Sequence, residues 1–170
     1  MNGYDQACLS NQAYKASASF VPALTTTVMK LLDPAPTDKI LDLGCGDGVL
    51  TQRIASAVPD GTVLGLDASQ AMVATARRSH ASPNCTYLVQ DCTRISADSP
   101  DLCQGQFDKV FANAALHWIL RNPDTRMGVL RDAYAALKPG GSFVFEMGGA
   151  GNCAEVHGAM IAALVHYGVP

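Results

Sequence analysis

The chain has 170 residues, of which 48% are hydrophobic and 16% are charged, and its formal net charge is −3. This length and composition predict one globular domain with a substantial core. Because the sequence has no run of lysines or arginines, it offers no electrostatic footprint for nucleic acid or for an anionic membrane. We therefore expect a small-molecule partner, with neither nucleic acid nor membrane involved.

The first residues lack the charged and apolar segments of a secretory signal, and no apolar run reaches the roughly 20 residues that span a bilayer. A cytoplasmic location is expected.

The six cysteines form no CxxC pair and lie in apolar segments, which favours buried free thiols over disulfides or zinc. No metal site is predicted.

Helical and alternating apolar spacings predict the elements in chain order. Residues 1–36 hold a leading helix over 19–32 and the start of a proline-containing linker. Strands are predicted over residues 39–44, 62–67, 85–91, 107–115 and 142–148. Helices are predicted over residues 48–58, 69–80, 124–141 with a Pro-Gly-Gly stop, and 153–168, and residues 92–106 as an irregular loop.

Strands that alternate with helices, and that are apolar on both faces, are typical of a parallel sheet covered on both sides. The predicted fold is a doubly wound, Rossmann-like α/β domain with a mostly parallel sheet of about five strands. One domain is predicted to occupy residues 1–170.

A glycine-rich turn marks the predicted ligand site. Asp42, Gly44, Gly46 and Gly48 lie where the first strand ends and the first helix begins, which is where doubly wound sheets bind ligands. Glycine permits a sharp turn and lets a ligand approach the backbone. The alternative is a tight turn without a ligand, because such motifs also match by accident.

Asp67 ends the second strand, where an acidic side chain accepts hydrogen bonds from ribose hydroxyls in such folds. The alternative for Asp67 is a surface carboxylate at the start of the next helix, whose predicted N-cap is Ser69. The spacing D-x-G-x-G-x-G differs from the dinucleotide pattern G-x-G-x-x-G. Because Asp42 and Asp47 flank the turn, they disfavour a pyrophosphate and favour a cationic ligand. An NAD-dependent oxidoreductase is therefore a distant alternative.

The segments "ILDLGCGDG", "GLDAS", "VQD" and "FANAALHW", in this order and spacing, resemble the class I S-adenosylmethionine-dependent methyltransferases. The run "NAALHW" followed by "LKPGGSFVFEMGG" is most similar to trans-aconitate methyltransferase-like fungal proteins. The resemblance covers roughly residues 11–150. It implies a methyltransferase with S-adenosyl-L-methionine as cofactor, and a family sheet of seven strands, of which this chain lacks the last two.

The resemblance also implies the cofactor contacts. Gly44, Gly46 and Gly48 would let the methionine part lie against the turn, and Asp42 would organise its ammonium group through the backbone or water. Asp67 would accept hydrogen bonds from both ribose hydroxyls.

The adenine would lie beyond the second and third strands. The resemblance implies that Ala68, Ser69 and Met72 pack near the ring. Asp91 would accept a hydrogen bond from the adenine amino group, and the Cys92 N–H would face a ring nitrogen.

Three further residues complete the implied cofactor site. Asn113 would help to hold the methionine through its backbone, and Cys45 fills a small-residue position that we interpret as packing. Tyr14 is either a lid over the cofactor or an ordinary surface tyrosine.

His117 and Trp118 follow the fourth strand, where the acceptor should approach, and they are the candidate catalytic residues. A carboxylic acid acceptor is already ionised at neutral pH, so formation of a methyl ester requires no general base. His117 could orient an acceptor or take its proton. The alternative is that "LHW" is a packing turn.

Residues 142–147 would form an apolar edge strand if no further strand follows. Two hypotheses would cover it: two copies pair through this strand or the last helix, or the 170 residues are a fragment of a longer protein. The alternative function is a truncated, non-catalytic homologue that acts as a cofactor-binding or interaction protein.

Overall fold

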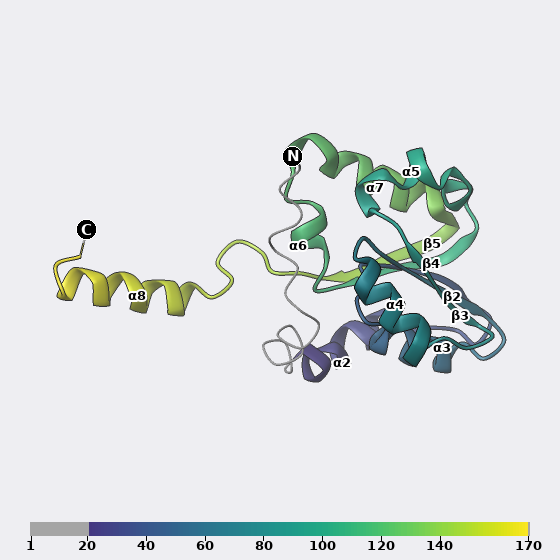
Figure 1. Ribbon diagram of the computed structural model, residues 1–170, viewed down its shortest axis with the longest axis horizontal. Helices are drawn as coiled ribbons and strands as arrows, with labels where there is room; N and C mark the ends of the chain where they lie inside the picture. Colours follow the sequence, from purple (N-terminus) through teal and green to yellow (C-terminus); the bar gives the residue numbers. More distant parts are fainter. Residues whose placement is uncertain (1–20, 170) are drawn as a thin grey trace.

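Five parallel strands carry the fold of the computed structural model, which describes residues 21–169 (Figure 1). The strands follow the order β3-β2-β1-β4-β5 across the sheet. They are β1 (Lys39–Leu43), β2 (Thr62–Asp67), β3 (Cys85–Val89), β4 (Phe107–Asn113) and β5 (Leu137–Glu146). Because β1 is flanked by β2 and β4, the direction of winding changes between β1 and β4, which is where ligands bind in such sheets.

Helices cover both faces of the sheet, as the sequence predicts (Figure 1). One face packs against α2 (Val21–Leu32), α3 (Val49–Ala57) and α4 (Gln70–Ser79). The other face packs against α5 (Ile95–Asp98), α6 (Leu116–Ile119) and α7 (Pro123–Ala136). The doubly wound α/β fold is therefore confirmed.

The apolar strand sequences explain why two cores form. In β1, Ile40 points into the core beneath α2 and α3, whereas Leu41 and Leu43 point into the core beneath α7. All three side chains are fully buried. A strand that is apolar on both faces can be stable only between two helical layers.

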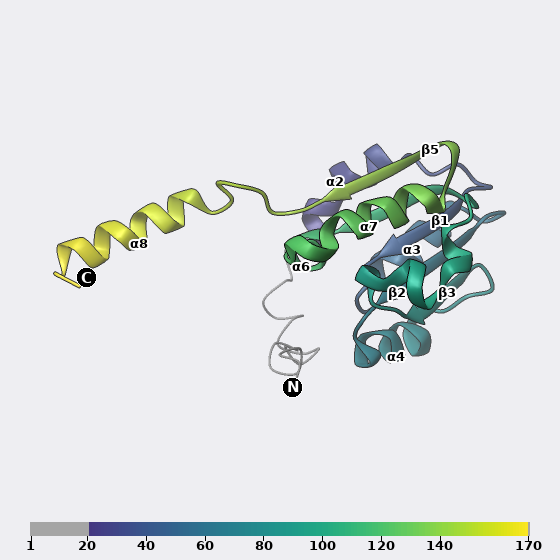
Figure 2. The same cartoon turned by 90° about the horizontal axis from the view of Figure 1, so that it is seen from above.

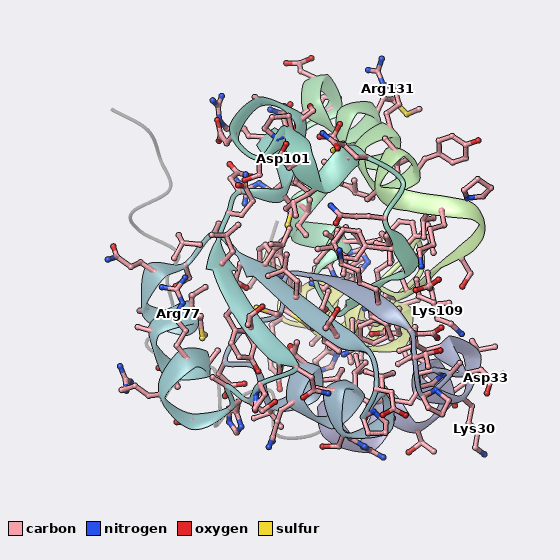
Figure 3. All side chains as sticks on the ribbon, turned by 90° about the vertical axis from the view of Figure 1, so that its right-hand side faces the viewer. Lys30, Asp33, Arg77, Asp101, Lys109 and Arg131 are labelled. Atoms are coloured by element: carbon pink, nitrogen blue, oxygen red, sulfur yellow. The ribbon has the colours of Figure 1, made fainter. Side chains whose placement is uncertain are left out.

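The predicted leading helix appears as α2 over Val21–Leu32, and its predicted first two residues lie outside the described range. The Lys109 ammonium on β4 donates a hydrogen bond to the Leu32 carbonyl over 2.6 Å and also bonds the Asp33 carbonyl. Figure 3 shows Lys109 beside Asp33, and Arg77 of α4 and Arg131 of α7 on opposite sides of the sheet. A cation at the helix C-terminus thus joins α2 to the sheet.

The prediction of an irregular loop over residues 92–106 is wrong for most of its length. The segment holds three short helices, namely η1 (Cys92–Arg94), α5 (Ile95–Asp98) and η2 (Pro100–Cys103). Asp91 caps η1, Ser99 bonds the buried Gln90, and Asp132 of α7 accepts a hydrogen bond from the Ser96 N–H. These partners are remote or local polar contacts that hydrophobic periodicity does not reveal.

The predicted helix over residues 124–141 ends earlier than expected. The last helical residue of α7 is Ala136, and Leu137 already has extended backbone angles. The strand β5 begins at Leu137 and includes the Pro-Gly-Gly run, with a register shift opposite Phe107 and Lys109 of β4. Strand pairing with β4 therefore extends β5 beyond the predicted 142–148 at its start.

The last helix, α8 (Ala154–His166), lies apart from the sheet and its covering helices (Figures 1 and 2). Residues 149–169 are all exposed. The strand β5 is an edge strand, as expected, because its other neighbour position is empty in the described part of the chain.

The single-domain organisation over residues 1–170 remains a prediction. No described helix combines the length and apolarity needed to cross a membrane.

Candidate cofactor site

The glycine turn between β1 and α3 is fixed by backbone hydrogen bonds to β2. The N–H groups of Gly44 and Cys45 both donate to the Leu66 carbonyl, over 2.8 and 2.9 Å. Gly44, Gly46 and Gly48 have positive φ angles of 77°, 56° and 85°. These left-handed conformations explain why glycine occupies every second position of the turn.

The three glycines nevertheless have different neighbours. A Cβ added to Gly44 would lie 2.4 Å from the Ala115 Cβ, and one added to Gly48 would lie 2.8 Å from the Ala76 Cβ and the Tyr87 hydroxyl. A Cβ on Gly46 would meet no described atom within 4 Å. Gly44 and Gly48 therefore allow close packing, whereas Gly46 offers open backbone to a ligand.

Asp67 fixes the turn at Gly46 through a hydrogen bond. One carboxylate oxygen accepts a hydrogen bond from the Gly46 N–H over 3.0 Å, and the other accepts from the Ser69 N–H over 2.8 Å. Each oxygen retains further lone-pair capacity for a hydroxyl donor. Ser69 caps α4 through the Met72 N–H, as predicted. Ala68 is exposed and Met72 is half-buried.

This arrangement fits a nucleoside cofactor of the predicted kind. The space above Gly46 is free of described atoms, and a carboxylate that can accept ribose hydroxyls adjoins it. A ligand would approach the backbone of Gly46, which a side chain at this position would block. A ligand with hydroxyl groups, and without a bulky anionic group, suits this combination.

Asp42 is buried and faces Thr51, whose hydroxyl donates to the Asp42 carboxylate over 2.7 Å. Burial raises the pKa of Asp42 to about 7, the Thr51 hydrogen bond lowers it, and the nearby Asp67 charge raises it further. Its carboxylate therefore lies inside the protein beneath the turn. Its implied role in organising an ammonium group remains a prediction.

Cys45 and Cys92 lie beside the same turn and are both buried. Burial is the main cause that raises the pKa of each thiol, and the pKa of Cys92 rises to about 12. Both thiols are therefore neutral at physiological pH. A Cβ added to Gly65 would contact Cys45 at 2.9 Å, which agrees with the interpretation of Cys45 as a packing residue.

The carboxyl ends of β3 and β4 complete the edge of the site. Asp91 accepts hydrogen bonds from the N–H and the hydroxyl of Thr93, both over 2.8 Å, and so stabilises η1 beyond β3. Asn113 is half-buried at the end of β4. The next residue, Ala114, has a positive φ of 51° and donates its N–H to the Glu146 carbonyl.

The helix α6 places His117 and Trp118 beyond β4, with their ring centroids 5.3 Å apart. Trp118 is 62% exposed, whereas Leu116 is fully buried, so Leu116 is the packing residue of this turn. The Nδ1 atom of His117 is buried and has no hydrogen-bond partner among the described residues. Buried polar atoms without a partner are rare in folded proteins.

Sequence reasoning missed two residues that support the site. Thr51 bonds Asp42, and the Tyr87 hydroxyl lies within hydrogen-bond distance of the Gly48 and His80 carbonyls. The sequence signal that could have identified Tyr87 is its polar hydroxyl group in an otherwise apolar strand. The predicted lid residue Tyr14 lies outside the described residues.

The described cysteines are all free thiols, but the prediction that they are buried holds for Cys45, Cys85 and Cys92 only, because Cys103 is half-buried and Cys153 is exposed. They are Cys45, Cys85, Cys92, Cys103 and Cys153. Within residues 21–169, no group of three or more His, Cys, Asp or Glu side chains could hold a metal ion.

Comparison with known proteins places this chain in a family. Residues 40–141 match the family described as a methyltransferase domain. A Schizosaccharomyces pombe protein named an uncharacterized methyltransferase is 38% identical over 159 residues, covering 94% of this chain. The trans-aconitate 2-methyltransferase of Deinococcus radiodurans is 36% identical over 111 residues, covering 65% of this chain.

Among solved structures, an S-adenosylmethionine-dependent methyltransferase from Mesorhizobium loti is 31% identical. Its TM-score is 0.55, and the match covers 76% of this chain and 53% of that one. The chain therefore belongs to the methyltransferase domain family. It spans 58% of the S. pombe relative and 38% of the D. radiodurans relative.

Proposed function

We propose that the protein binds S-adenosyl-L-methionine and transfers its methyl group to a small molecule, with a carboxylic acid as the acceptor and a methyl ester as the product. The observation that carries this proposal is the open backbone at Gly46 next to the Asp67 carboxylate. Gly44, Cys45 and Gly48 of the same turn are closely packed.

The residues around the turn would each hold part of the cofactor. Asp67 keeps lone pairs for the ribose hydroxyls while its bonds to Gly46 and Ser69 fix its orientation. Gly46 admits the methionine part, and Met72 and Asp91 adjoin the space for adenine. When bound, the cofactor supplies a methyl group on a sulfonium, already activated for transfer.

The chain's own contribution to transfer is positioning. Holding an acceptor in line with the methyl group corresponds to effective molarities of roughly 10⁵–10⁸ M. A carboxylate acceptor is ionised at neutral pH, so it attacks without losing a proton. We assign His117 the role of orienting the acceptor, because its Nδ1 is buried and lacks a described partner. Trp118 adjoins it as an exposed wall.

The preference for a carboxylic acid has two supports. First, the site needs no general base for such an acceptor. Second, a relative 36% identical to this chain is named trans-aconitate 2-methyltransferase, and its named acceptor is a carboxylic acid. The proposed cytoplasmic location is compatible with small acids of this kind.

A second candidate function is cofactor binding without turnover. The high exposure of Trp118 favours it, because the acceptor side of the site is open to solvent. Transfer of reactive groups is normally shielded from water. Separate measurements of binding and of turnover distinguish the two functions.

The test is transfer of a labelled methyl group from S-adenosylmethionine to a panel of small di- and tricarboxylic acids, each paired with its alcohol analogue. We expect base-labile methyl esters with acids and none with alcohols. Asp67→Ala should abolish transfer, whereas Asp60→Ala, which changes an exposed aspartate, should not. Cofactor binding without any transfer would select the second function, and absence of binding would overturn both.

A further inference from the structure

The Tyr87 side chain lies beneath the glycine turn because two glycines leave room for it. In the sheet, Gly65 of β2 pairs with Tyr87 of β3 and, on its other side, with Asp42 of β1. A Cβ added to Gly65 would lie 2.8 Å from the Tyr87 Cδ1, and one added to Gly48 would lie 2.8 Å from the Tyr87 hydroxyl. The buried Tyr87 ring therefore extends from β3 to the start of α3.

The Tyr87 hydroxyl connects the ends of two helices. It lies 3.2 Å from the carbonyl oxygen of Gly48, the N-cap residue of α3, and 3.1 Å from that of His80, the C-cap residue of α4. The hydroxyl has one proton, so the two carbonyls share it. The Cys85 thiol donates to the hydroxyl oxygen over 3.2 Å. The hydroxyl is therefore both donor and acceptor, and its removal would cost hydrogen bonds inside the protein.

The main chain of Tyr87 is held by α4 as well. Arg77 of α4 donates to the Tyr87 carbonyl from Nε over 3.0 Å and from Nη2 over 2.8 Å. Hydrogen bonds from a charged donor are stronger than those between neutral groups. Tyr87 thus contacts α4 through its carbonyl and through its hydroxyl, which gives the hydroxyl a fixed place beside the start of α3.

The open backbone at Gly46 lies between two fixed points of the turn. Before it, the Cys45 N–H donates to the Leu66 carbonyl of β2 over 2.9 Å. After it, the Gly48 carbonyl accepts the first hydrogen bond of α3 and the contact from Tyr87. The first point depends on the main chain alone, whereas the second depends on one side-chain hydroxyl. Removal of this hydroxyl should therefore loosen the turn on the α3 side and leave the sheet paired.

We propose that the Tyr87 hydroxyl is a positioning group for the cofactor, because it holds the Gly48 carbonyl next to the end of α4 and so keeps the Gly46 backbone in the conformation that binds the cofactor. Tyr87 acts through the turn, since its ring is buried beneath Gly48. A turn that is not held must be ordered when the cofactor binds, and this cost lowers affinity. The inference rests on the proposed function, because it concerns the cofactor site of that reaction.

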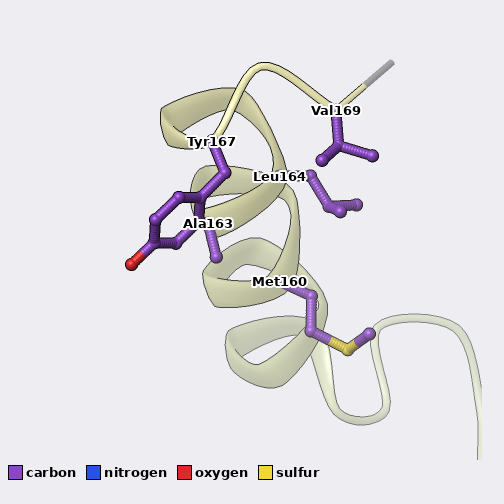
Figure 4. Close-up of a pocket in the computed structure, with 5 residues that line it drawn as sticks. All are labelled: Met160, Ala163, Leu164, Tyr167 and Val169. Atoms are coloured by element: carbon purple, nitrogen blue, oxygen red, sulfur yellow. The ribbon is translucent and has the colours of Figure 1, made fainter.

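The test is calorimetric titration of S-adenosylhomocysteine into wild type, Tyr87→Phe and Tyr167→Phe. Tyr87→Phe keeps the ring and removes only the hydroxyl. Tyr167→Phe makes the same change on α8, where Tyr167 is exposed beside a hollow lined by residues from 160 to 169, apart from the sheet (Figure 4). We expect Tyr87→Phe to bind at least about fivefold more weakly than wild type, and Tyr167→Phe to bind as wild type does.

A second control separates positioning from a general loss of stability. Val63→Ala removes two methyl groups from the core that contains Tyr87, at the end of β2 opposite to Asp67. It should lower the melting temperature and keep wild-type affinity in titrations run well below that temperature. Without ligand, amide exchange at Gly48 and in the first turn of α3 should be faster in Tyr87→Phe than in wild type, and unchanged in Val63→Ala.

The outcomes separate this inference from the proposed function. Equal affinity of Tyr87→Phe and wild type, equal weakening in Tyr87→Phe and Val63→Ala, or unchanged amide exchange at Gly48 in Tyr87→Phe would overturn the role of Tyr87 and leave the cofactor site in place. Wild type that binds no S-adenosylhomocysteine would overturn the proposed function and this inference together.

Discussion

Each glycine of the turn between β1 and α3 meets a different neighbour, and these neighbours decide what the residue does. Gly44 allows β1 to approach Ala115 at the point where the sheet changes its direction of winding. Gly48 admits the Tyr87 side chain beneath the start of α3. Gly46 alone among these three has open space where a side chain would be. The repeated motif therefore combines two positions that are closely packed with one position that is open.

Asp42 should make stability fall as the pH rises. Its pKa is about 7 in the folded chain, above the ordinary 3.8. Between these values the folded chain binds more protons than the unfolded chain, so the free energy of unfolding decreases with rising pH and levels off above about pH 7. The maximal cost is on the order of 4 kcal/mol.

Asp42→Asn cannot ionise, and the Thr51 hydroxyl can still donate to its amide oxygen. We expect the variant to match wild type closely near pH 4 and to be more stable by about 4 kcal/mol near pH 8. Urea unfolding over this pH range measures the difference, with exposed Asp60→Asn as control. Parallel pH curves for wild type and Asp42→Asn would contradict the assignment.

At the scale of elements, the short helices over residues 92–103 depend on α7. The buried Asp132 carboxylate accepts a hydrogen bond from the Ser96 N–H over 3.0 Å. Asp132→Ala leaves this N–H without its partner, and we expect a loss of about 1–3 kcal/mol in the free energy of unfolding. Amide hydrogen exchange should become faster in residues 92–103.

The control for this change is Arg131→Ala, which alters an exposed neighbour on the same helix. It should leave exchange in residues 92–103 at the wild-type rate. Equal protection of the Ser96 amide in Asp132→Ala and wild type would show that α7 does not hold this segment in place.

The elements that the sequence predicts well are those with a strong local signal. The alternating apolar residues of β1 and β2 and the Ser69 cap of α4 act within a few residues. The ends of α7 and β5 could not be predicted in this way. There, pairing of Leu137 with Phe107 of β4 overrides the expected Pro-Gly-Gly stop.

At the scale of the molecule, the winding order brings together residues that are distant in the sequence. The turn at Gly44, the carboxylate of Asp67 and the start of α6 at Leu116 converge because β1, β2 and β4 are neighbours in one parallel sheet. The glycine spacing and Asp67 could be read from the sequence as a candidate site. The support from Thr51 and Tyr87 could not, because it depends on contacts made only after folding.

The sequence does not predict where α8 lies relative to the sheet. Helical periodicity predicts α8 but contains no information on which surface it contacts. It projects from the domain, and large apolar side chains of α8 are exposed.

The most direct measurement is calorimetric titration of S-adenosylhomocysteine into wild type, Gly46→Ala and Gly140→Ala. Gly140 also has a positive φ, 82°, and a Cβ there would meet no described atom within 4 Å, so it matches the backbone strain at Gly46. We predict that wild type and Gly140→Ala bind alike, and that Gly46→Ala binds at least about tenfold more weakly. Equal affinity of Gly46→Ala and wild type, or no binding to wild type, would contradict a cofactor site at this turn.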